Sequence, residues 1–130
     1  METKGIQVPN YSCFYFTTES GKSPVEEFIN SLDEKTQEKF IFKKGLLEHF
    51  GPQLRQPHTD KIGDGIFELR FKGEEGQIRL LFFFFYEKKI ILLHGFVKKT
   101  QKTPRIEIKI AKQRKKEFLN KQRKISHEES

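Results

Sequence analysis

The stretch that decides the fold is IRLLFFFFYEKKIILLHGFVKKTQKTP, from Ile78 to Pro104. It holds two apolar runs, Leu80–Phe85 and Ile90–Leu93, separated by the short polar segment Glu87–Lys89. Runs of about four to eight β-branched and aromatic residues between turn signals are typical of buried strands. The stretch therefore predicts a buried β-hairpin. Because lysines follow directly on its second strand, it also predicts a rigid scaffold that holds cations for a phosphate group.

A further strand precedes this hairpin. In Ile66–Phe71 the apolar side chains alternate with Glu68 and Arg70, which predicts one face toward the core and one charged face. The segment Gly73–Gly76 predicts a tight turn into the next strand. If that turn is symmetric, Arg70 lies directly across from Arg79.

Three elements are predicted before these strands. Residues 11–17 form a first strand, and a short helix begins at Pro24 with Ser23 and Glu26 as a capping box. A longer helix runs from its cap Asp33 to about Phe50, and residues 53–65 form a polar loop. The side chains expected to face the core are Val25, Phe28, Ile29 and Leu32 in the first helix and Phe40, Leu47 and Phe50 in the second.

A last helix is predicted from Thr103 onward, with Ile106, Ile110 and Phe118 at helical spacing, although the alternation at Ile106, Ile108 and Ile110 leaves a strand open. The ends, 1–10 and 120–130, are expected to be flexible. The pattern predicts one domain over residues 1–130 of the α+β class. Two N-terminal helices pack on one face of a mostly antiparallel four-stranded sheet, together with a C-terminal helix.

The positive charge is concentrated in one segment. The chain has 130 residues and a net charge of +7, and between Lys98 and Lys124 there are 12 Lys or Arg against 2 Glu, or +10, which leaves −3 elsewhere. A basic segment on a nearly neutral body indicates a polyanion partner, and a solubilising tail or solvated helix face explains the charge equally well.

Several function classes are excluded on sequence grounds. The single cysteine, Cys13, predicts a buried structural thiol in a reducing compartment. No metal-ligand spacing, P-loop or GxGxxG motif occurs, so we expect neither a metal nor a cofactor. No signal peptide or long apolar run is present, which predicts a cytoplasmic protein without a membrane partner.

The charged face offers candidate site residues. Two arginines opposed on a sheet repel each other, and a phosphate between them would turn this repulsion into attraction. The alternative is that Glu68 or another carboxylate pairs with one of them. His94 is either a satisfied core histidine or a general acid or base, and Phe96 either stacks on a nucleobase or belongs to the core. The cations that follow are Lys98, Lys99, Lys102 and Arg105.

These patterns together resemble a known family. The order of elements, the box DGIFELR at 64–70, the strand that begins at Arg79 and the segment HGFVKKTQKTP at 94–104 resemble the RelE/ParE toxin superfamily, and within it the phage-derived HigB-like toxins. The resemblance covers residues 11–119. It implies the toxin of a type II toxin–antitoxin system, neutralised by a HigA-like antitoxin with a helix-turn-helix domain.

The resemblance also implies roles for single residues. Arg79 matches the arginine that contacts the scissile phosphate, Lys99 matches a basic residue of phosphate binding or proton transfer, and Arg70 lies in a strand that lines the RNA site. Glu68 stands where RelE has a lysine, and no tyrosine follows Lys99. The general base is therefore left open between Glu68 and His94, and the general acid between Lys99 and His94.

The function expected from this resemblance is a metal-free endoribonuclease that cleaves mRNA on the ribosome. The 2′-OH of the RNA would attack the adjacent phosphate, with the catalytic group Glu68, Arg70, Arg79, His94 and Lys99. Phe96, Lys98, Lys102 and Arg105 would bind the RNA, and the basic last helix would bind ribosomal RNA. Two rival classes remain: a ParE-like inhibitor of DNA gyrase and a non-catalytic nucleic-acid-binding module.

Overall fold

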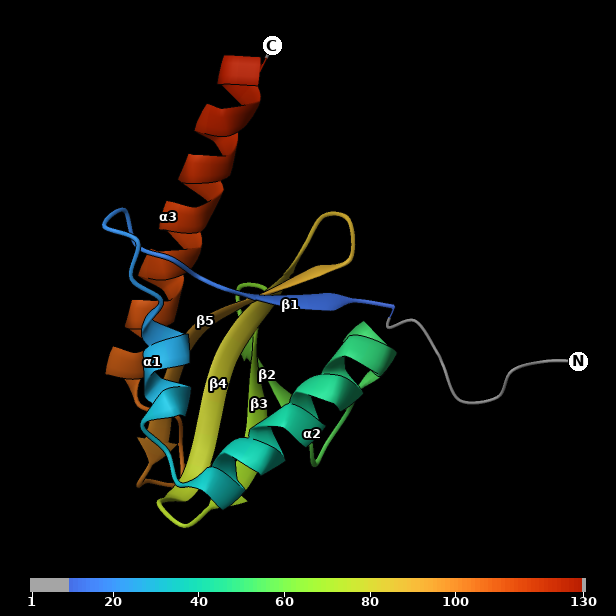
Figure 1. Ribbon diagram of the computed structural model, residues 1–130, viewed down its shortest axis with the longest axis vertical. Helices are drawn as coiled ribbons and strands as arrows, with labels where there is room; N and C mark the ends of the chain where they lie inside the picture. The colour runs from blue at the N-terminus through green and yellow to red at the C-terminus, as the bar shows by residue number, and fades with distance from the viewer. Residues whose placement is uncertain (1–9, 130) are drawn as a thin grey trace, which may run out of the picture.

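The apolar runs become the central strands of a five-stranded sheet in the computed structural model, which describes residues 10–129. The order across the sheet is β1-β5-β4-β3-β2. The antiparallel strands β3 (Ile66–Gly73), β4 (Gly76–Phe85) and β5 (Lys89–Lys98) form the centre, and β1 (Ser12–Tyr15) adds to β5 in parallel (Figure 1). The predicted hairpin is thus confirmed.

The prediction of four strands is wrong, because the segment expected to be a polar loop contains a strand. β2 (Thr59–Gly63) pairs with β3 as the edge of the sheet. An edge strand with polar residues on its open side carries no apolar run, so its sequence looks like a loop. The turn that follows has positive φ at Asp64 and Gly65 (54° and 76°), which a tight reversal requires.

Two helices precede the central strands and cover one face of the sheet. They are α1 (Pro24–Asn30) and α2 (Glu34–Phe50), and a short 3₁₀ turn, η1 (Gly51–Gln53), ends α2. The Asp33 side chain accepts a hydrogen bond from the backbone N–H of Lys35, which confirms it as a cap. Ser23 makes no such bond, so the predicted capping box is wrong. Phe50 is also not a core residue, because 43% of it is exposed.

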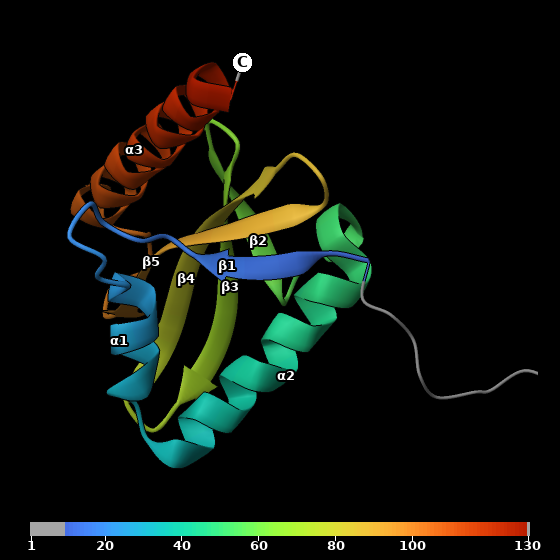
Figure 2. The ribbon, with the colours of Figure 1, turned by 45° about the horizontal axis from the view of Figure 1, so that its top comes forward.

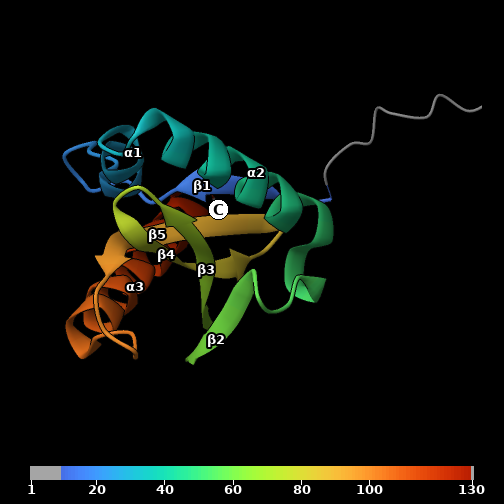
Figure 3. The same ribbon diagram turned by 90° about the horizontal axis from the view of Figure 1, so that it is seen from below.

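The prediction that all helices share one face is wrong as well. The helix α3 (Arg105–Glu129) lies on the face opposite α1 and α2 (Figure 3), where Ala111 is buried and Phe118 packs on Phe83 and Phe85. The reason is visible in β4, which is apolar on both faces and needs a cover on each. The sheet thus separates two apolar layers.

The helix α3 is also longer than the apolar pattern of the sequence predicts. The helix continues past Leu119 to Glu129, and its C-terminal turns rise beyond the sheet (Figures 1 and 2). Ile106, one of the three apolar residues at helical spacing, is 62% exposed. The sequence predicts that residues 1–10 are flexible, and all of these except Asn10 lie outside the described residues. None of the described helices is long and apolar enough to cross a membrane.

Two glycines give opposite predictions for stability. A Cβ on Gly95 would approach the Phe28 ring and the Leu80 side chain to 2.5 and 2.6 Å, whereas a Cβ on Gly45, inside α2, meets nothing within 4 Å. We expect Gly95→Ala to lower the free energy of unfolding by about 1–3 kcal/mol through overpacking. Gly45→Ala, the matched control, is expected to raise it by about 1 kcal/mol. Urea denaturation measures both, and equal effects would contradict this packing.

Candidate functional site

The strand register brings the two arginines of the charged face together. Arg70 pairs with Arg79 across β3 and β4, as the symmetric turn predicts. The side chains at 68, 70 and 79 lie on the face that α3 covers, because their neighbours Leu69, Ile78 and Leu80 belong to the apolar layer under α1 and α2. The charged face therefore exists, and it lies beside the basic C-terminal segment.

A buried carboxylate occupies the position between the arginines. Glu68 is 1% exposed, and its Oε2 accepts a hydrogen bond from Arg70 Nε at 2.8 Å and lies 3.7 Å from Arg79 Nε. Arg70 Nη2 also donates to Asp60 Oδ2 at 2.9 Å. The sequence left open whether a carboxylate pairs with the arginines, and in the structure Glu68 does so. The anion between Arg70 and Arg79 is thus a side chain of the protein itself and not a ligand.

This chain of four side chains has no net charge. Arg70 and Arg79 contribute two positive charges, and Glu68 and Asp60 contribute two negative ones. Burial lowers the pKa of Arg79. The carboxylate of Glu68 opposes this shift, whereas the positive charge of Arg70 adds to it. An arginine still keeps its proton under these conditions. An incoming phosphate would therefore need either a change of partners here or the cations around the cluster.

Arg79 has a hydrogen-bond donor left over. Its Nη1 donates to the carbonyl oxygen of Ile78 at 2.9 Å and, more weakly, to Gln77 Oε1 at 3.5 Å. Among the buried side-chain nitrogen and oxygen atoms of the described residues, its Nε is the one without a hydrogen-bond partner. A buried unpaired donor costs about 1–3 kcal/mol, so a ligand oxygen close to Glu68 would satisfy it. This makes Arg79 the arginine best prepared for an anion.

The remaining oxygen of Glu68 contacts a hydroxyl group. Thr103 Oγ1 donates to Glu68 Oε1 at 2.7 Å, and this bond ties the linker between β5 and α3 to the charged face. The sequence suggested Thr103 only as the start of a helix, and Asp60 only as part of a loop. Neither partner of the cluster could be found without the register of β2 and the path of the linker.

His94 fastens α3 to the sheet. Arg114 Nη1 lies 3.2 Å from His94 Nδ1, and His94 Nε2 lies 2.8 Å from Glu107 Oε1. Because an arginine can only donate, Nδ1 is the acceptor, and the protonated Nε2 donates a hydrogen bond to Glu107 Oε1. Both ring nitrogens are thus engaged inside the protein. The ring is also stacked on Phe96, with the centroids 5.6 Å apart.

Phe96 is not placed to stack on a nucleobase. It is 6% exposed and belongs to the apolar layer under α3, so the prediction that it binds RNA is corrected to a core residue. Cys13, expected to be buried, is half-buried against the other apolar layer, and burial raises the pKa of its thiol to about 12. A thiol with this pKa is a poor nucleophile.

The state of His94 predicts a pH dependence of stability. Burial lowers its pKa below the ordinary value of about 6.5, and Glu107 opposes the shift. Below that value the unfolded chain binds a proton that the folded protein does not, so stability falls as pH falls from about 7. Urea denaturation at pH 7.5 and 5.5 should show this loss, and His94→Gln should reduce it.

A second histidine provides the control for this experiment. The pKa of His58 is also lowered, by burial and by the neighbouring Lys43. His58→Gln should therefore remove only part of the pH dependence. A loss of stability between pH 7.5 and 5.5 that is the same in the wild type and in His94→Gln would contradict the described contacts of His94.

Four cations flank Thr103, the linker residue that contacts the neutral cluster. Lys98, at the end of β5, is half-buried, and Lys99, Lys102 and Arg105 of the linker and the first turn of α3 are exposed. None of the four makes an ion pair with another described residue, so their positive charge is uncompensated. Within residues 10–129 no group of three His, Cys, Asp or Glu side chains is arranged to hold a metal ion.

The family of the chain follows from a comparison with known proteins. Residues 27–116 match the family described as phage derived protein Gp49-like (DUF891). The chain belongs to this family. Gp49-like proteins are a family of RelE-like toxins associated with toxin–antitoxin systems, which implies an antitoxin partner. The matched region of this Gp49-like protein includes the whole neutral cluster, His94 and the first turns of α3. No curated protein matches the chain.

Proposed function

We propose that this Gp49-like protein is an mRNA endoribonuclease that acts on translating ribosomes, within a type II pair whose antitoxin is HigA-like and carries a helix-turn-helix domain. The observation that carries the proposal is the contact of Glu68 with a hydroxyl group beside Arg79. A carboxylate that accepts a hydroxyl proton, next to a guanidinium with a free donor, is the arrangement that RNA cleavage by its own 2′-OH requires.

The roles follow from the geometry. Thr103 Oγ1 sits where a 2′-OH would have to sit to pass its proton to Glu68, so the linker has to move when RNA binds. Arg79 would direct its unpaired Nε to a non-bridging oxygen of the phosphorane and stabilise its added charge. Arg70 would hold Glu68 in place. Lys99 is the candidate general acid for the 5′-oxygen, because it is exposed and unpaired among the described residues.

RNA binding is assigned to the cations around this centre. Lys98, Lys102 and Arg105 would contact the phosphates on either side of the cleaved bond, and α3 would lie along ribosomal RNA with its exposed lysines. His94 would keep α3 at this distance from the sheet through Glu107 and Arg114, as a positioning residue rather than as the acid or base.

The contact with Thr103 gives a prediction. Because its hydroxyl must leave Glu68 before a 2′-OH can take its place, Thr103→Val is expected to cleave ribosome-bound mRNA at least as fast as the wild type. Glu68→Gln, which cannot accept the proton, is expected to lose activity on the order of 100-fold or more. Single-turnover cleavage measures both. A Thr103→Val variant that is as inactive as Glu68→Gln would contradict the assignment.

One observation favours a second candidate. The cluster on the charged face is internally neutral and both nitrogens of His94 are engaged, and a protein without free acid–base groups would suit a ParE-like inhibitor of DNA gyrase. Induction of the protein followed by mapping of mRNA 5′ ends separates the two. New ends inside translated codons support the nuclease, whereas intact mRNA with arrested replication supports the gyrase inhibitor and contradicts the proposal.

A further inference from the structure

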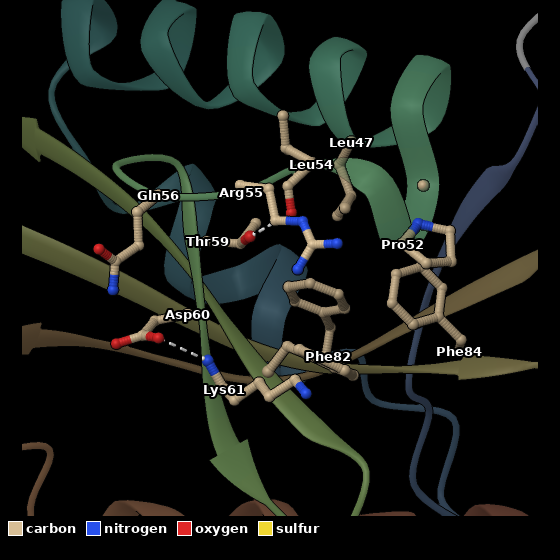
Figure 4. Close-up of a pocket in the computed structure, with 12 residues that line it drawn as sticks. Leu47, Pro52, Leu54, Arg55, Gln56, Thr59, Asp60, Lys61, Phe82 and Phe84 are labelled. Carbon is tan, nitrogen blue, oxygen red and sulfur yellow. Dashed lines mark hydrogen bonds between the residues drawn. The ribbon is translucent and has the colours of Figure 1, made fainter.

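A pocket lies on the face of the sheet opposite the charged cluster. It has a volume of about 400 Å³ and opens between the end of α2 with η1 on one side and strands β2 to β4 on the other (Figure 4). Three phenylalanines of the sheet, Phe67, Phe82 and Phe84, line it, with ring centroids 5.4 to 5.8 Å apart. We call this the aromatic pocket.

In the aromatic pocket, large apolar side chains remain partly exposed to solvent. Phe82 is buried, but Phe67, Phe84 and Leu54 of the lining are only half-buried. Burying such apolar surface against a partner is favourable because it removes the surface from water. The neighbouring Phe50, at the end of α2, is also exposed. Apolar side chains are therefore exposed both in the pocket and at the end of α2.

The rim of the aromatic pocket is cationic. Arg55 and Lys61 are exposed, and neither forms an ion pair with a described residue. In Figure 4 the guanidinium of Arg55 points from the helix side toward the rings of the sheet. Asp60, which also borders the pocket, is already paired with Arg70. A ligand that complements this rim carries negative charge.

Two observations favour an apolar side chain over a nucleobase as the ligand. The buried Thr59 hydroxyl donates to the backbone oxygen of Leu54 at 2.8 Å, so it is not available to read the edge of a base. The basic segment that would bind RNA is on the other face, with α3 (Figure 3). A large apolar side chain needs no hydrogen bond from the lining, and carboxylates beside it would meet Arg55 and Lys61.

We propose that the aromatic pocket is a docking site for the antitoxin, and that it receives one large apolar side chain from an acidic segment of that protein. The antitoxin partner is implied by the family, and its acidic character is inferred from the cationic rim formed by Arg55 and Lys61. The pocket opens on the face of the sheet opposite the charged face and shares only Asp60 with the charged cluster. Antitoxin docking here leaves the catalytic residues in place, and the proposal does not depend on the nuclease activity.

Selection from a library of random 12-residue peptides displayed on phage tests this. The full chain is the bait, and the readout is the affinity of the enriched peptides for two variants. We expect enrichment of peptides with a large apolar residue flanked by Asp or Glu, and a loss of affinity on the order of tenfold or more with Arg55→Glu/Lys61→Glu. Lys22→Glu/Lys35→Glu, the control with the same charge change at exposed positions remote from the pocket, should retain affinity.

Three results would overturn the proposal: no enrichment, enriched peptides without this pattern, or equal loss of affinity in both charge-reversal variants. A further result would assign the pocket to RNA instead, namely a weaker binding of a single-stranded RNA 12-mer by Arg55→Glu/Lys61→Glu than by the control. Leu54→Glu, which changes the apolar wall, should weaken the same peptides, and its melting temperature verifies that it is folded. Cleavage of mRNA by these variants, measured in parallel, separates a failure here from a failure of the proposed nuclease.

Discussion

Glu68→Ala is expected to lower the free energy of unfolding by about 3–5 kcal/mol, the largest stability effect of any single exchange in the charged cluster. Removing one partner of a buried ion pair leaves the other charge without compensation in a medium of low dielectric constant. Here the substitution removes the bond to Arg70, the charge that faces Arg79 and the acceptor of Thr103 together. Urea denaturation at pH 7.5 measures the loss.

Two variants control for the cause of this loss. Asp60→Ala removes the outer and more exposed carboxylate of the cluster, so its cost should stay below about 1 kcal/mol. Glu68→Leu/Arg79→Met replaces the buried pair by apolar side chains, and should recover most of the stability without activity. A Glu68→Ala protein as stable as Asp60→Ala would show that the carboxylate is not buried as described.

Arg79→Lys is expected to keep the fold and to lose RNA cleavage by roughly 100- to 1,000-fold. Lysine retains the positive charge that compensates Glu68, but it lacks the planar fork and the Nε donor that we assign to the phosphorane. The loss of one such donor costs about 3–4 kcal/mol of transition-state stabilisation. Single-turnover rates on ribosome-bound mRNA measure the effect.

The conservative exchange is preferable to alanine at this position. Arg70→Ala/Arg79→Ala would leave Glu68 buried without any cation, and a loss of activity in that protein would be inseparable from unfolding. Lys22→Arg, at an exposed position away from the cluster, is the matched control and should be fully active. An Arg79→Lys protein that cleaves RNA at the wild-type rate would remove Arg79 from the site.

Much of the fold could be predicted because local chemistry determines it. The apolar runs of β4 and β5, the turn at Gly73–Gly76 and the cap at Asp33 depend on neighbours in the sequence, and the structure has all three. The opposition of Arg70 and Arg79 followed from that turn. The apolar run of β4 also contained the signal for covers on both faces, which the prediction of one helical face overlooked.

The residues that complete the site were not predictable because they come from distant segments. Asp60 reaches Arg70 only through an edge strand that has no apolar pattern, and Thr103 reaches Glu68 only because the linker folds back over β3. The role of His94 depends on α3, whose position no local pattern fixes. Sequence therefore indicated which residue types belong to the charged face, and tertiary contacts determined their partners.

The chemical nature of the RNA ends tests the proposed activity most directly. The purified protein is incubated with ribosome-bound mRNA in the presence of EDTA at a concentration that leaves the ribosomes intact, and the ends of the fragments are identified. Attack by the 2′-OH predicts 2′,3′-cyclic phosphate and 5′-OH ends, and no cleavage at a site that carries a 2′-deoxy nucleotide. Fragments with 5′-phosphate ends, cleavage at the deoxy site, or intact mRNA would contradict the proposal.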